Sequence, residues 1–163
     1  MNINTDQGNV LSLTLTGVGL GDAEDLFNLA AQEAGLSGDD ALPDATPFND
    51  NVPNLLKYAF NLNLSGADNT TMTLGGNGGL PLATIVEIDG LDFWHIEFVE
   101  KRNSLLVYTI FESTTLDSLT FTEVTTPVTR VPIDDNWMRV SLTIPLDSLP
   151  DNAFYREGVE FGN

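Results

Sequence analysis

The sequence predicts a mostly β protein: an antiparallel β-sandwich, immunoglobulin-like or jelly-roll-like, with an α-helical hairpin inserted near the N-terminus. Between residues 80 and 161, short stretches of β-branched and aromatic residues alternate with turn-forming residues, as in the strands of a sandwich. Between residues 22 and 62, apolar residues instead recur at helical spacing on both sides of a polar loop. The length of 163 residues suits a single domain with its own core, which we expect over residues 1–163.

A first strand is predicted over residues 9–17. From Val10 to Thr16, leucines alternate strictly with serine and threonine, which is the pattern of a strand with one buried face. We expect this strand to join one of the sandwich sheets. The glycine-rich residues 17–21 then end it.

Two helices are predicted, over residues 22–34 and 53–62. Asp22 is a suitable N-cap for the first helix, and Gly35 is a natural residue just beyond its C-terminus. Pro53 is tolerated in the first turn of the second helix. The helical spacing predicts that these residues are buried: Leu26, Phe27, Ala30, Leu55, Ala59 and Phe60.

The remaining strands follow a glycine-rich connection, residues 61–79, which we expect to be a linker or loop with one short strand at 72–74. Asp89-Gly90 between two of the later strands is a strong signal for a two-residue hairpin turn. The predicted strands of the sandwich are 82–88, 91–99, 104–113, 121–124, 128–133, 137–144 and 154–161.

The acidic loop between the two helices has the outline of a degenerate calcium-binding EF-hand loop. In that alignment Asp50 and Asn54 fall at ligand positions, and Asp44 is a further acid of the loop. Phe48, however, brings no side-chain oxygen, and Lys57 places an ammonium where the loop needs its bidentate carboxylate. We therefore expect that calcium, the only candidate cofactor, has lost its site, and that Lys57 pairs with Asp44 or Asp50 instead.

The same segment resembles a known family. Residues 34–41, 43–50 and 54–61, the last containing Asn-Leu-Leu-Lys-Tyr-Ala, resemble the C-terminal accessory domain of large secreted proteins from marine bacteria of the Verrucomicrobia and Planctomycetes type. Residues 79–81, 108–114 and 154–156 are also similar to that family, so the resemblance covers about residues 9–161. It implies an exported, non-catalytic module. Many relatives carry Asp-x-Asp-x-Asp-Gly in the loop and glutamate in place of Lys57.

The only histidine is the one residue that invites a catalytic interpretation. In the strand 91–99, Trp94 and its even-numbered neighbours are expected to face the core, so His95 and Glu97 face outward. A histidine beside a glutamate can act as a base or a metal ligand. We favour a cross-strand pair at the surface, because no serine or aspartate is placed by the sequence to complete a catalytic triad.

Aromatic residues of the strands offer a candidate ligand-binding site. Trp94, Trp137 and Tyr155 could form a platform on which sugar rings stack, or they could fill the core. Trp137 alternates with the polar residues of its strand, so we expect it to be more exposed than Trp94.

Charge excludes several classes of partner. The net charge is −18, and residues 1–100 hold 15 acidic residues and a single cation, Lys57, a net of −14. Nucleic acid and anionic membranes both require clustered lysine and arginine, so neither is an expected partner. The chain has no cysteine and no apolar run long enough to be inserted in a membrane.

These observations favour a non-catalytic accessory module that serves adhesion, display or assembly at the cell surface or outside the cell. Residues 1–6 have no cationic and apolar leader, so an exported module would belong to a longer protein. Its expected partners are polysaccharide or neighbouring domains of that protein. The alternatives are a carbohydrate-binding module appended to a polysaccharide-degrading enzyme, a calcium-stabilised module and, last, an enzyme.

The charge also predicts a response to salt. Because the acids repel one another, added monovalent salt should raise the melting temperature, as the screening length falls from about 30 Å at 0.01 M to about 8 Å at physiological ionic strength. Sodium and potassium should act equally, and acidification toward about pH 5 should not destabilise the fold. A melting temperature that falls or stays flat with salt would show that favourable ion pairs dominate.

Overall fold

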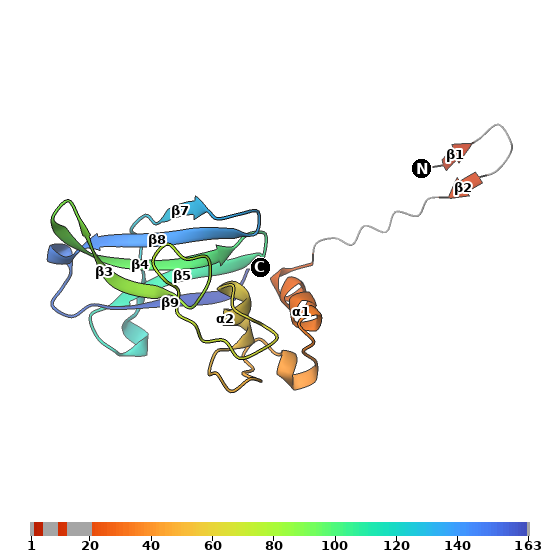
Figure 1. Ribbon diagram of the computed structural model, residues 1–163, viewed down its shortest axis with the longest axis horizontal. Coiled ribbons are helices and arrows are strands. Elements are labelled where there is room, and N and C mark those ends of the chain that lie inside the picture. Colours follow the sequence, from red (N-terminus) through yellow and green to blue (C-terminus); the bar gives the residue numbers. More distant parts are fainter. Residues whose placement is uncertain (1, 5–9, 13–20, 163) are drawn as a thin grey trace.

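The structure is a computed structural model, which describes residues 2–4, 10–12 and 21–162 (Figure 1). Its helices are α1 (Ala23–Glu33) and α2 (Asn54–Ala59), with short 3-10 turns η1 (Gly38–Ala41), η2 (Ser118–Thr120) and η3 (Leu146–Ser148). Its strands are β1 (Asn2–Asn4), β2 (Val10–Ser12), β3 (Leu82–Ile88), β4 (Leu91–Lys101), β5 (Leu106–Ser113), β6 (Thr122–Glu123), β7 (Thr129–Pro132), β8 (Trp137–Pro145) and β9 (Phe154–Phe161).

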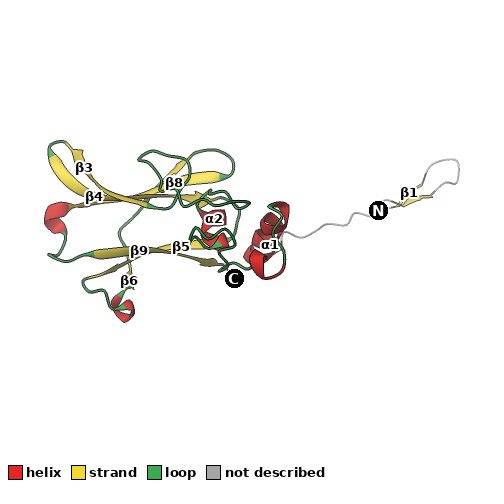
Figure 2. Ribbon diagram, turned by 60° about the horizontal axis from the view of Figure 1, so that its bottom comes forward, coloured by secondary structure: helices red, strands yellow, loops and turns green. Residues whose placement is uncertain are grey.

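Two antiparallel sheets lie face to face, as the strand pattern predicts (Figure 2). One sheet has the order β3-β4-β8-β7 and the other the order β6-β5-β9. The β3–β4 hairpin turns at Asp89 and Gly90, whose φ values of 54° and 79° are those of the predicted two-residue turn. The sandwich and its hairpin are therefore confirmed.

The N-terminal strand differs from the prediction. Within the described residues, β2 covers Val10–Ser12 and pairs with β1 in a separate two-stranded ladder, rather than with a sheet of the sandwich. Residues 9 and 13–17 of the predicted strand lie outside the described residues. The short strand predicted at 72–74 is also wrong, because the pairing there is a single bridge between Thr71 and Leu80.

Helix α1 begins and ends where its capping residues predict. The Asp22 side chain accepts a hydrogen bond from the backbone N–H of Asp25, at 2.9 Å. At the other end Gly35 adopts a φ of 83°, and the Leu36 N–H donates back to the carbonyl of Ala31. This is a Schellman motif, which uses the left-handed conformation that glycine accepts without strain.

Helix α2 is shorter than the predicted range of 53–62. It ends at Ala59, because Asn61 adopts a left-handed φ of 57° and the N–H of Leu62 turns back to the carbonyl of Lys57. The same Schellman geometry thus ends both helices, here with asparagine in place of glycine. Because the helix ends at Ala59, the next residue, Phe60, packs against the two sheets.

Phe60 is the residue that joins the helical pair to the sandwich core. It is 2% exposed, and its ring meets Phe98 of β4 and Tyr108 of β5 at centroid distances of 6.2 and 6.1 Å. The Tyr108 hydroxyl accepts from the Lys101 N–H and donates to the Ala59 carbonyl, at 2.9 and 3.1 Å. Burial raises the pKa of Tyr108 well above its usual range. Helix α2 therefore closes one end of the sandwich (Figure 2).

A second apolar cluster attaches α1. Phe27 is fully buried and its ring contacts Tyr58 of α2 and Phe161 of β9, at 5.7 and 5.8 Å between ring centroids. The predicted burial of Phe27, Ala59 and Phe60 is confirmed. Three other residues predicted to be buried are only half-buried: Leu26, Ala30 and Leu55.

The position of Phe60 predicts that Phe60→Ala will destabilise the fold by about 3–5 kcal/mol, because it removes the ring that fills the space between the two sheets. Chemical denaturation would measure the change in the free energy of unfolding. Leu119→Ala is the matched control, since Leu119 is 91% exposed and its truncation should change stability by less than about 0.5 kcal/mol. A similar cost for the two variants would contradict this account of the core.

Candidate functional site

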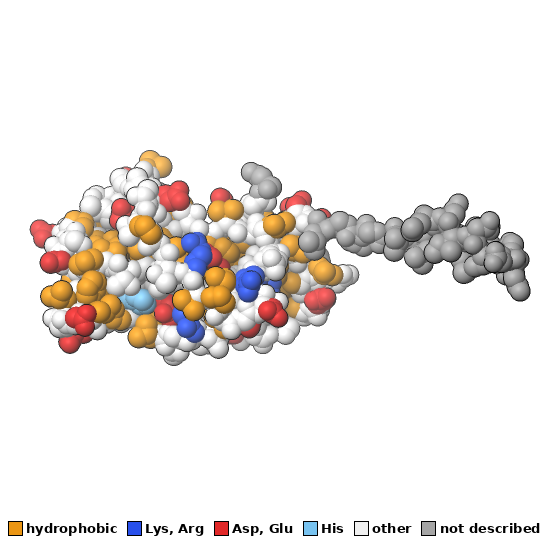
Figure 3. Space-filling view, turned by 90° about the horizontal axis from the view of Figure 1, so that it is seen from above, with side chains coloured by type: hydrophobic (Ala, Val, Ile, Leu, Met, Phe, Trp, Pro, Cys, Tyr) orange, Lys and Arg blue, Asp and Glu red, His pale blue; other side chains and the backbone are white. Residues whose placement is uncertain are grey.

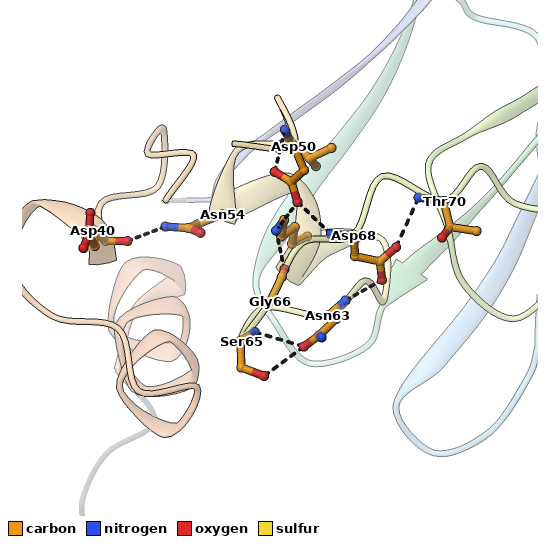
Figure 4. Close-up of polar contacts among 10 residues, drawn as sticks. Asp40, Asp50, Asn54, Asn63, Ser65, Gly66, Asp68 and Thr70 are labelled. Atoms are coloured by element: carbon orange, nitrogen blue, oxygen red, sulfur yellow. Dashed lines mark hydrogen bonds and ion pairs between the residues drawn. The ribbon is translucent and has the colours of Figure 1, made fainter. Parts of the chain in front are cut away.

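The ammonium group of Lys57 joins the loop between α1 and α2 to the segment after α2, where it contacts Asp50 and Gly66 (Figure 4). Lys57 is fully buried, and its Nζ lies 2.5 Å from Oδ2 of Asp50 and 2.7 Å from the carbonyl oxygen of Gly66. The ring of Phe48 covers the ammonium, with its centroid 4.7 Å away. The predicted pairing of Lys57 with an acid of the loop is confirmed for Asp50, and both side chains of the pair are buried.

Asp50 is held as a carboxylate by three donors. Besides Lys57, the backbone N–H of Val52 donates to Oδ1 at 3.2 Å and that of Asp68 donates to Oδ2 at 2.7 Å. Burial acts to raise the pKa of Asp50, but these hydrogen bonds, led by that of Lys57, outweigh it and lower the pKa to about 2. The loop thus has a complete internal ion pair at neutral pH.

The other two predicted calcium ligands do not converge on this point. The amide nitrogen of Asn54 donates to the carbonyls of Asp40 and Leu42, at 2.8 and 2.9 Å, so this side chain closes the loop. Asp44 is exposed, and its carboxylate makes no hydrogen bond or ion pair with the described residues. Within the described ranges, no three His, Asp or Glu side chains are grouped to hold a metal ion. Asp50 and the Asn54 amide nitrogen are thus engaged within the loop, and the loss of the calcium site stays a prediction.

The segment after α2 contributes contacts that the sequence did not predict. Asp68 accepts from the backbone N–H groups of Asn63 and Thr70, at 2.9 and 3.1 Å, and these hydrogen bonds lower the pKa of Asp68. The turn from Asn63 to Asp68 places the Gly66 carbonyl against Lys57. The available signal was the pair of short motifs Asn63-x-Ser65 and Asp68-x-Thr70, which are typical of side chain-to-backbone turns.

A second polar cluster lies on the outer face of the sheet β3-β4-β8-β7. Nδ1 of His95 lies 2.8 Å from the Thr143 hydroxyl, and its Nε2 lies 3.4 Å from a carboxylate oxygen of Glu97. The predicted outward direction is correct, but the expected surface position is not, since the side chains of His95 and Glu97 are only 12% and 8% exposed. The glycine-rich segment contacts Glu97 through the backbone N–H of Gly75.

Glu97 and Arg139 fasten that glycine-rich segment. The Glu97 carboxylate accepts from the backbone N–H of Gly75 at 2.6 Å, and the Arg139 guanidinium donates to the Gly75 and Gly76 carbonyls and to the Asn77 side chain. The glycine-rich run is therefore a fixed connection rather than a flexible one. Glu97, the carboxylate beside the only histidine, is thus engaged in holding the glycine-rich segment.

The three aromatic residues of the predicted sugar platform do not lie together. Trp137 is only 8% exposed, packs in the core and lies under the ammonium of Lys101, 4.5 Å from its ring centroid. The expectation that Trp137 is more exposed than Trp94 is wrong, because Trp137 belongs to the buried core cluster whereas Trp94 is half-buried. Trp94 and Tyr155 do meet, at 6.2 Å between ring centroids with the planes tilted by 31°.

No protein-family model matches the chain, and a search of curated proteins finds no significantly similar sequence. Among the residues that the structure describes, no helix has the length and apolar character needed to cross a bilayer.

The geometry of the loop predicts that millimolar calcium will not raise the melting temperature beyond the effect of sodium chloride at equal ionic strength. The reason is that the Lys57 ammonium already neutralises Asp50, and a dication would be repelled from the same point. A rise of several degrees that is specific to calcium and is lost in Asp50→Ala would contradict this.

The low pKa of Asp50 predicts that the free energy of unfolding decreases at acidic pH. Because the pKa in the folded state, about 2, is below the ordinary value of 3.8, the contribution of Asp50 is complete above about pH 4 and is lost as the pH falls toward 2. An NMR titration of the Asp50 carboxyl carbon would measure this pKa. Lys57→Met should raise it, whereas Arg130→Met, which removes a cation from β7, should leave it unchanged. An Asp50 pKa near 3.8 that Lys57→Met does not move would refute the role of the pair.

Proposed function

We propose that this chain is a non-catalytic accessory module of an exported or cell-surface bacterial protein, where it serves adhesion, display or assembly. The observation that supports this most strongly is the loop centred on Lys57. The segment that resembles the calcium-binding loop of secreted accessory domains is here closed by an internal ammonium, which would let it stabilise the fold without metal. A self-sufficient fold of this kind suits a domain attached to other domains.

The polar groups of the outer face support the same proposal. Glu97 and Arg139 hold residues 75–77 through several hydrogen bonds, which is a structural role. A catalytic acid or base must instead reach a substrate. This arrangement favours a supporting domain over an enzyme.

An exposed apolar surface supports contact with neighbouring domains. Hydrophobic side chains gather at the end of the molecule away from α1 (Figure 3), and the β3–β4 hairpin lies at this end (Figure 1). Ile85 and Leu91 of this hairpin are 57% and 64% exposed. β3 is also an edge strand, with one row of backbone groups unpaired within its sheet. Such surfaces are typical of contacts between domains.

Fractionation of a bacterium that encodes the chain tests this proposal. Peptides from residues 21–162 should be detected by mass spectrometry in the medium or surface fraction, and within a polypeptide longer than 163 residues. A free protein of 17.7 kDa confined to the cytoplasm would overturn the proposal.

A further inference from the structure

The end of the sandwich opposite α2 is open and forms a cavity of about 530 Å³. It lies between β5 and β9 on one side and the end of β8 with η3 on the other, far from α1 and α2 (Figure 1). A cavity of this size suits a small ligand or one end of a longer chain. Six of the residues that line it are Glu112, Thr114, Thr122, Ile144, Leu149 and Tyr155.

Glu112 interrupts the core-facing pattern of β5 at this opening. Tyr108 and Ile110 face the other sheet, and because side chains alternate along a strand, Glu112 points the same way. Its cross-strand partners are Tyr155 on β9 and Thr122 on β6. A phenol, a carboxylate and a hydroxyl therefore form one row across the sheet, on the face that opens into the cavity.

The lining is rich in hydroxyl groups and has no cation. Serine and threonine side chains and the Tyr155 phenol supply the hydroxyls, Glu112 supplies the one carboxylate, and no lysine, arginine or histidine lines the cavity. A phosphate, sulfate or carboxylate ligand would meet only negative charge here. A neutral ligand with many hydroxyl groups can instead donate to Glu112 and exchange hydrogen bonds with the threonines.

Part of this lining is already rigid. The Ser113 and Thr120 hydroxyls lie 2.6 Å apart, and Ser148 donates to the Pro145 carbonyl at 2.7 Å. By contrast, the exposed side chains of Thr114 and Thr122 make no hydrogen bond with the described residues, so they are available to a ligand. A preorganised wall with available donors reduces the entropy cost of binding.

Tyr155 and Ile144 provide an aromatic and apolar wall, and Trp94 packs beside them. Trp94 is the cross-strand partner of Ile144, and its ring contacts that of Tyr155, so it lies beside two residues of the lining. Its Nε1–H is buried and has no acceptor among the described residues. A buried donor without a partner is costly, so an oxygen that reached this N–H would stabilise it. The apolar face of a sugar ring packs well on such a wall.

We propose that this cavity binds a neutral sugar unit, as the end or a branch of a polysaccharide. The sugar ring packs on Tyr155, and its hydroxyls donate to the Glu112 carboxylate and pair with Thr122. The inference goes beyond the accessory role and does not depend on it. It moves the carbohydrate site away from Trp137 to the open end of the sandwich.

Isothermal titration and saturation-transfer NMR with defined oligosaccharides test this proposal. The probes are the hexasaccharides of cellulose, laminarin, xylan and mannan, with an alginate hexasaccharide as the anionic comparison. At least one neutral probe should bind with a Kd of about 1 mM or tighter, and the alginate probe should bind more weakly. No binding of any neutral probe at about 10 mM, or a preference for alginate, would overturn the proposal.

Variants then locate the binding. Glu112→Gln should weaken it about tenfold, because the charge-assisted hydrogen bonds are lost, and Thr122→Val should weaken it less. Both residues are exposed, so both variants should fold, whereas truncating Tyr155 would disturb Trp94. Glu160→Gln is the matched control, since this exposed acid of β9 lies outside the cavity lining. Equal affinity for Glu112→Gln and the unchanged protein would refute the site.

Discussion

The buried ammonium of Lys57 is the constraint on which the arrangement of the helical half depends. It joins Asp50 in the loop before α2 to Gly66 in the loop after it, while Phe48 covers it from solvent. A buried charge is tolerated only when it is paired and hydrogen-bonded, so these segments must come together for any one of them to be stable. The loop around Asp50 consists mainly of polar, proline and turn-forming residues, so it has few apolar side chains with which to form a core of its own. The ion pair therefore holds this loop in place.

Fixing α2 in this way determines how the sandwich is closed. The helix ends at Ala59, and Phe60 then packs edge-on against the rings of Phe98 and Tyr108, one from each sheet. This end is therefore filled by side chains and sealed by the Tyr108 hydroxyl. The opposite end has no such plug, and Glu112 occupies its core-facing position. The two ends thus differ in chemistry: the closed end stabilises the fold, and the open end is the candidate binding site.

The sequence predicts what depends on local pattern and misses what depends on distant contacts. Alternation along β3 and β9 and the turn at Asp89-Gly90 predict the sandwich. The capping residues of α1 predict where that helix begins and ends. Lys57 was correctly expected to pair with an acid, because its charge has to be matched nearby. The burial of Trp137 was missed, because it depends on packing within the core cluster and under the ammonium of Lys101, which alternation along β8 does not reveal. The cavity beside Glu112 likewise appears only when two sheets are brought together.

The most direct test of the central role of Lys57 is a double-mutant cycle with Lys57→Met and Asp50→Asn, measured as free energies of unfolding in urea at neutral pH. We expect each single change to cost about 3–5 kcal/mol, since it leaves a buried polar or charged partner unmatched. The double variant should cost clearly less than the sum of the two, because the partners are lost together. Single changes that each cost under about 1 kcal/mol and simply add would place this pair among ordinary surface ion pairs and contradict the account.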